Sequence, residues 1–282
     1  MPALYAHYRF GEAVAKALPP AFSDFLEQYP QAFALGTQGP DILFYYHPIK
    51  KNETKAYGTH LHALAAEGFY LDVGKQMLNA AEKHADVSGI LQANGAFAAY
   101  ICGFLCHFTL DVSCHKYIDD SENKKVSHGR IESEFDKFLL TKDGKGIRGY
   151  NTATPIKDEN GAREACAKAL QVPQEKIAEA IKNMRKINGW FSCKNESFHR
   201  FAHFVLTLAK LERKFGDMFL HKKDEAYCTN TNEVLLGKFN AAVPKAAELI
   251  EEYFSSLPHA VKKQTLNEIF RYNYSGIKIT KE

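Results

Sequence analysis

Apolar residues recur along this 282-residue chain at the spacing of amphipathic helices, and alternating runs typical of strands are nearly absent. Helical spacing is clear in 61–84, and the longest apolar run lies in 88–118. The pattern predicts an all-α protein, a multi-helix bundle of roughly nine or ten helices. The predicted helices cover 8–18, 21–34, 61–84, 88–118, 127–141, 162–170, 173–187, 196–221, 231–256 and 259–271.

Polar segments separate these helices, and they show neither an internal repeat nor low complexity. Ser127 is the expected N-cap of the helix 127–141. We expect residues 1–282 to form a single domain, with the chemistry in 1–136 and further helical packing in 137–282. The expected loops are 36–48, 119–125 and 141–161.

The composition is that of a soluble globular protein with a large core, because 45% of the residues are hydrophobic and 24% are charged. The formal net charge is only +3, and the lysines and arginines are spread along the chain. Nucleic acid is therefore not the favoured partner.

The run Gly89–Leu110 is long enough to suggest a membrane-spanning helix. Asn94, His107 and Asp111, in or beside this run, favour a buried helix of a bundle instead. We therefore expect no transmembrane segment, although transient contact with a membrane is compatible with the sequence.

Charged residues interrupt the first helical segment at Arg9, Glu12 and Lys16, so we predict no signal peptide. The six cysteines show no metal-knuckle spacing, and we expect reduced thiols in a cytoplasmic protein.

Three polar residues lie on one stripe of the apolar helix 88–118. His107, Asp111 and His115 are four residues apart, and each step of four drifts only about 40° around a helix. Such a stripe is either a buried ion-pair network or one wall of a metal site.

The next helix carries a second pair at the same spacing, His128 and Glu132. A short loop joins the two helices, so we expect them to be antiparallel neighbours. Their side chains would then face each other across the bundle interior, where helical proteins commonly hold metals. Histidine and carboxylate ligands without thiolate suit zinc in a hydrolytic site.

Upstream candidates complete a recognisable order of residues. That order is His7, Asp41, His60 or His62, then H-x3-D-x3-H at 107–115 and H-x3-E at 128–132. Over about residues 5–136 the chain resembles the zinc-dependent phospholipase C family. It is more distantly similar to the tri-zinc nucleases and to the N-terminal domain of glycosylphosphatidylinositol-specific phospholipase D.

The resemblance implies a cofactor of two to three Zn²⁺ ions and a role for Asp41 in orienting or deprotonating the attacking water. It does not decide between His60 and His62. The implied ligands are Asp41, His62 (or His60), His107 and Asp111 for one zinc, His115, His128 and Glu132 for a second, and His7 with a bridging Asp111 for a third.

The implied activity is hydrolysis of a phosphodiester, either a phospholipid or a soluble one, by metal-activated water. Tyr45 and Tyr46 are the first candidates for binding a choline-like cation. One alternative is a tri-zinc-type nuclease or nucleotide phosphodiesterase. The other is a non-catalytic, metal-binding helical protein.

Overall fold

The computed structural model describes residues 4–82, 84–124, 126–208, 216–220 and 225–280. These residues form helices and no β-strand, which confirms the predicted all-α class. The α-helices are α1 Leu4–Ala17, α2 Pro20–Gln28, α3 Pro30–Gly36, α4 Glu53–Ala63, α5 Glu67–Ala80, α6 Val87–Asn94, α7 Ala96–Ser121, α8 His128–Lys142, α9 Asn160–Leu170, α10 Gln174–Phe191, α11 Glu196–Leu208 and α13 Cys228–Lys263. Short 3-10 helices are η1 Gly39–Tyr45, η2 Gly216–Met218 and η3 Glu268–Arg271.

Two predicted helices are each divided at a single residue. The segment 21–34 breaks at Tyr29, because Pro30 has no N–H to continue a helix and begins α3 instead. The segment 88–118 breaks at Gly95, whose φ of 49° is a conformation that favours glycine. The predicted Ser127 N-cap is confirmed, since its hydroxyl accepts a hydrogen bond from the Arg130 amide at 3.1 Å.

Three other boundaries differ from the prediction. The helix expected at 61–84 is two helices, α4 and α5, and α4 already begins at Glu53 because Asn52 caps it. The loop expected at 36–48 contains η1. The structure describes α11 as far as Leu208 and a separate 3-10 helix, η2, at Gly216–Met218, and residues 209–215 and 221 of the predicted helix 196–221 lie outside the described residues.

The helices predicted at 231–256 and 259–271 are mostly one helix, because α13 continues through Pro244 and Pro258 to Lys263. A proline inside a helix costs about 3 kcal/mol. The buried apolar face of α13 compensates for this cost, with Tyr253, Phe254 and others packed into the core.

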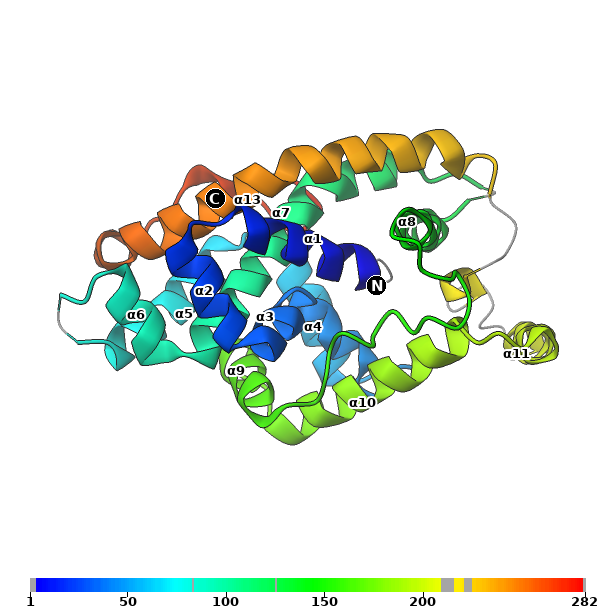
Figure 1. Cartoon of the computed structure of the whole chain (residues 1–282), viewed down its shortest axis with the longest axis horizontal. Helices are drawn as coiled ribbons and strands as arrows, with labels where there is room; N and C mark the ends of the chain where they lie inside the picture. The colour runs from blue at the N-terminus through cyan, green and yellow to red at the C-terminus, as the bar shows by residue number, and fades with distance from the viewer. Residues whose placement is uncertain (1–3, 83, 125, 209–215, 221–224, 281–282) are drawn as a thin grey trace.

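Helix α7 forms the centre of the molecule and is covered by α1, α3, α9 and α13 (Figure 1). It is the described helix that is long and apolar enough to cross a membrane, but 89% of its most apolar window is buried inside the protein. A buried core helix is what the sequence predicted.

Helices α3 and α7 approach each other closely through two glycines. A Cβ atom on Gly36 would lie 2.1 Å from the Tyr100 carbonyl oxygen, and one on Gly103 would lie 2.2 Å from that of Phe33. No other residue fits at either position. This contact brings Thr37, which follows α3, against the polar stripe of α7.

Candidate metal centre

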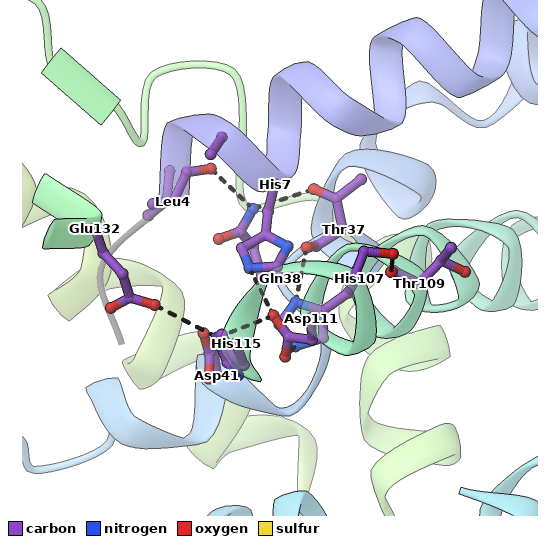
Figure 2. Close-up of polar contacts among 12 residues, drawn as sticks. Leu4, His7, Thr37, Gln38, Asp41, His107, Thr109, Asp111, His115 and Glu132 are labelled. Carbon is purple, nitrogen blue, oxygen red and sulfur yellow. Dashed lines mark hydrogen bonds and ion pairs between the residues drawn. The ribbon is translucent and has the colours of Figure 1, made fainter. Parts of the chain in front are cut away.

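Eight of the nine predicted ligands, all except His60, come from five elements and converge near the C-terminal half of α7, and Figure 2 shows several of them. Among the described residues they form three clusters of candidate ligand atoms. The clusters are His7, His107 and Asp111; Asp41, His62 and His107; and His115, His128 and Glu132. The third cluster is the set that the resemblance implies for one zinc, whereas Asp111 lies with His7 and His107 and outside the cluster of Asp41. The ligand assignments stay predictions.

The first two clusters share His107. Its Nε2 lies 3.1 Å from Asp111 Oδ2, and His7 Nε2 lies 3.3 Å from Asp111 Oδ1. Beside them, His62 Nε2 lies 3.1 Å from Asp41 Oδ1.

The third cluster joins α7 to α8. Glu132 Oε1 lies 3.4 Å from His115 Nε2 and 3.2 Å from His128 Nε2. The His115 Nε2 atom is also 3.3 Å from Asp111 Oδ1, so Asp111 links this cluster to His7.

The predicted antiparallel arrangement of α7 and α8 is wrong. Figure 1 shows α8 nearly end-on, whereas α7 runs across the view, so the two helices cross steeply. They still bring their polar residues together, because the end of α7 meets the start of α8 at the cluster that contains His115 and His128.

The distances between these donor atoms suit zinc. Ligand atoms about 2.0–2.1 Å from a tetrahedral zinc are about 3.3 Å from each other. Five histidine–carboxylate distances within the clusters, and the His115–Asp111 distance that joins two of them, fall between 3.1 and 3.4 Å.

Three histidines are oriented with Nε2 toward the clusters by a partner on Nδ1. The Gly58 carbonyl accepts from His62 at 2.7 Å, and the Thr37 carbonyl accepts from His107 at 3.2 Å. A carbonyl only accepts, so Nδ1 carries the proton and Nε2 keeps its lone pair. The Asp119 carboxylate contacts His128 Nδ1 at 2.8 Å in the same role, which is the usual arrangement around a zinc-binding histidine.

Buried atoms without hydrogen-bond partners support a metal rather than a satisfied polar network. His107 Nε2 and Asp111 Oδ2 are 3.1 Å apart but lack hydrogen-bond geometry, and His7 Nδ1 has no partner. An unmade hydrogen bond of a buried polar atom costs about 1–3 kcal/mol. Zinc bound at Nε2 and Oδ2 would remove this cost for both atoms, so the residues fit the ion.

Burial and charge set the protonation of the cluster residues. Burial lowers the pKa of His107, which keeps its ring neutral and ready to bind a metal. Burial also disfavours the charged form of Asp111, but His107 and His115 outweigh it and hold its pKa well below the ordinary value. For His115, burial is outweighed by Asp111 and Glu132, which raise the pKa to about 9.

The remaining predicted residues lie around the clusters. His60 is exposed on α4, outside all three clusters, and the structure brings His62 rather than His60 to Asp41. Tyr45 is buried, and its hydroxyl accepts a hydrogen bond from Asn188 at 3.2 Å. Tyr46 is partly exposed and lies beneath the Lys176 ammonium, 5.5 Å from the ring centroid, so a cation of this chain already contacts it.

Sequence reasoning missed residues that shape the centre without being ligands. Gly39 has a φ of 50°, and a Cβ there would lie 2.3 Å from the His107 ring. The available signal in the sequence was that Gly39 directly precedes Pro40, because a glycine–proline pair often marks a turn. Tyr274 packs its ring 5.1 Å from that of His62, and nothing near position 274 in the sequence indicated this contact.

Asp136 lies on the same face of α8 as His128 and Glu132, but its carboxylate binds the start of α1 rather than joining the clusters. Its two oxygens accept hydrogen bonds from the amides of Tyr5 and Ala6, at 3.1 and 2.8 Å. These amides have no partner within α1, so the carboxylate caps the helix that presents His7.

Comparison with known proteins identifies the family. The family described as zinc dependent phospholipase C matches residues 6–187, a segment that contains every candidate ligand described above. No curated protein and no solved structure matches the chain. Because the match spans well over half of the sequence, this chain belongs to the zinc-dependent phospholipase C family, whose members are phosphoric diester hydrolases.

Proposed function

We propose that this protein uses two to three zinc ions to hydrolyse the phosphodiester bond of a phospholipid, with Asp41 accepting a proton from the attacking water. The observation that carries the proposal is the set of three adjoining clusters, linked through His107 and Asp111, within the residues that match the family. When bound there, zinc supplies a Lewis acid that acidifies water and neutralises phosphoryl oxygens.

The difference in exposure among the carboxylates supports the role of Asp41. The Asp41 side chain is 21% exposed, whereas those of Asp111 and Glu132 are 2% and 4% exposed. Asp41 is therefore the carboxylate of the clusters that solvent and substrate reach most easily. The contact with His62 orients its Oδ1 atom, which leaves the second oxygen to accept a proton from water.

The histidines divide in the same way and define the side from which substrate arrives. His62, His115 and His128 are 18–30% exposed, while His7 and His107 are almost completely buried. We infer that the phosphate group approaches the partly exposed histidines and that the buried ones only hold metal.

A cytoplasmic location is part of the proposal. The six cysteines are free thiols, and five of them are buried, which supports folding in a reducing compartment. Contact with a membrane would then be transient, as the enzyme collects its substrate.

The first test is release of phosphorylated head group from phosphatidylcholine by zinc-loaded protein, together with zinc content. Two to three zinc ions per chain and lipid hydrolysis are expected, and both should fall when His128 and Glu132 are replaced by alanine. Hydrolysis of single-stranded nucleic acid or of soluble phosphodiesters alone would contradict the lipid assignment. Bound zinc with no turnover of any of these substrates would indicate a non-catalytic protein.

Helix α4 offers a matched pair of variants for this test. His62→Ala removes a side chain 3.1 Å from Asp41, and His60→Ala removes an exposed one two residues away. The first variant should lose activity and zinc, and the second should retain both.

A further inference from the structure

Large hydrophobic side chains gather on one part of the surface. Of the nine that are exposed among the described residues, six lie on α11, at the end of α10 or just after η1. We call them the apolar patch: Ile49, Trp190, Phe201, Phe204, Val205 and Leu208.

Helix α11 presents an apolar stripe to solvent, where an amphipathic helix usually carries polar residues. Phe201, Phe204, Val205 and Leu208 follow the i, i+3, i+4, i+7 pattern of one helix face, and each is 43–69% exposed. The opposite side holds His199, which is buried.

A groove of about 380 Å³ lies between α10 and α11. Trp190 and Val205 border it, and the buried rings of Phe191 and Phe219 also line it. Its volume falls within the range of sites that hold small apolar ligands. The apolar patch therefore combines an exposed helix face with an apolar groove.

Cations accompany the patch. Lys186 lines the groove, with its ammonium 4.9 Å from the Trp190 ring centroid. Exposed Lys50 and Lys51 follow Ile49, and exposed Arg200 precedes Phe201.

The nearby acids are paired with basic groups. Glu196 lies 2.7 Å from Arg148, and Glu179 lies 3.2 Å from His47. An apolar helix face with basic residues at its edge is the pattern of helices that lie in the interface of anionic membranes.

The patch adjoins the wall that carries Asp41. Helix η1 contains Asp41 and ends at Tyr45, and Pro48 and Ile49 of the groove follow directly. Asn183 lines the groove and donates a hydrogen bond to the Tyr45 carbonyl at 3.1 Å. Figure 1 shows α11 next to the end of α10, on the same side of the molecule as α8.

We propose that α11 and the groove form the docking surface for an anionic phospholipid bilayer. The four apolar side chains of α11 enter the region below the head groups, and Lys186 and Arg200 contact lipid phosphates. This inference deepens the proposed function, since docking here delivers lipid beside Asp41. Helix α11 lies beyond the residues that match the family, whereas Ile49 and Lys186 lie within them.

The chain contains a reporter for the test, because Trp190 is its single tryptophan and belongs to the patch. Vesicles of phosphatidylcholine with phosphatidylglycerol should shift the Trp190 emission to shorter wavelength and sediment the full chain. Vesicles of phosphatidylcholine alone should bind it more weakly. The variant Phe201→Ser with Phe204→Ser should bind anionic vesicles roughly tenfold or more weakly.

The matched control is Leu64→Ser with Ile277→Ser, which removes two exposed apolar side chains outside the patch and should leave vesicle binding unchanged. Binding is measured with metal-free protein, so it is independent of catalysis. Vesicle binding by the metal-free protein, together with no phosphatidylcholine turnover by the zinc-loaded protein, would overturn the proposed function and retain the docking surface. Equal vesicle binding by both double variants would overturn the docking surface. It would also be overturned if the wild-type protein bound no lipid but formed dimers, and if the variant Phe201→Ser with Phe204→Ser did not form them.

Discussion

The metal centre has an inner and an outer half that differ in burial. In the inner half, His107 and Asp111 are almost fully buried, and the Thr37 carbonyl orients the His107 ring. In the outer half, Asp41 and His128 are 21% and 30% exposed, and each contacts a further polar side chain. The difference suggests a division of labour, in which the inner half holds metal and the outer half handles water, protons and substrate.

Replacing Asp111 by asparagine should have the largest effect. Its carboxylate lies within 3.3 Å of His7, His107 and His115, so it connects two of the three clusters. We expect loss of at least one zinc per chain and a fall in phosphodiesterase activity on the order of a thousandfold or more. Elemental analysis and a chromogenic phosphodiester measure both, and full zinc retention would contradict the role of the inner half.

Replacing Asp41 by asparagine tests the outer half. If Asp41 mainly accepts a proton, kcat should fall by roughly a hundredfold while most of the zinc stays bound. Loss of zinc in parallel with activity would instead make Asp41 a holding residue like Asp111. The comparison of zinc content between the two aspartate variants separates these outcomes.

Replacing Gly39 by alanine should distort the backbone beside His107 and so disturb the inner half. The φ of 50° disfavours alanine, and its Cβ would lie 2.3 Å from the His107 ring. We expect the free energy of unfolding to fall by about 1–3 kcal/mol, together with weaker zinc binding. Gly237→Ala is the control, because no atom surrounds that position in α13 and alanine favours helix there. Equal effects of the two substitutions on denaturant unfolding would contradict the prediction.

Loss of the proton from His115 should make the metal-free protein less stable at high pH. Its pKa is raised from 6.5 to about 9, so its stabilising contribution is complete below pH 6.5 and disappears as the pH rises through about 9. The loss should be on the order of 2 kcal/mol in urea unfolding. The variant His115→Gln should remove this part of the pH dependence. Zinc affinity should change in the opposite direction, rising with pH, because the metal requires a neutral ring.

The sequence predicted the candidate ligands better than the arrangement of the helices around them. Spacing of four placed His107, Asp111 and His115 on one stripe, because helix periodicity is a local property. The crossing of α7 and α8 depends instead on contacts with distant segments, and no local pattern encodes it. The same is true of Tyr274, which reaches His62 from the far end of the chain.

The choice between His60 and His62 shows where local information ends. Residues two apart point to nearly opposite sides of a helix, so only one of them can face Asp41. Helix α4 has just two buried residues, Thr54 and Gly58, and therefore no apolar stripe that would indicate its inner face. The packing of α4 against η1 decides, and that packing is a tertiary feature.

Replacing Asp119 by asparagine should have the smallest effect and tests how the outer half is supported. Asp119 contacts His128 Nδ1 at 2.8 Å and is itself half exposed, so its loss should weaken zinc binding at this cluster about tenfold. Lys116→Ala is the control, because its ion pair with Asp120 lies on the same turn of α7 and away from the clusters. Titration with a competing zinc chelator measures the change.

In the inner half the Thr37 carbonyl is the group that orients a histidine ring, that of His107, and no side-chain substitution removes a carbonyl. The partner that orients His128 can therefore be removed by a side-chain substitution, whereas the partner that orients His107 cannot, and an Asp119 variant with unchanged zinc affinity would remove that distinction.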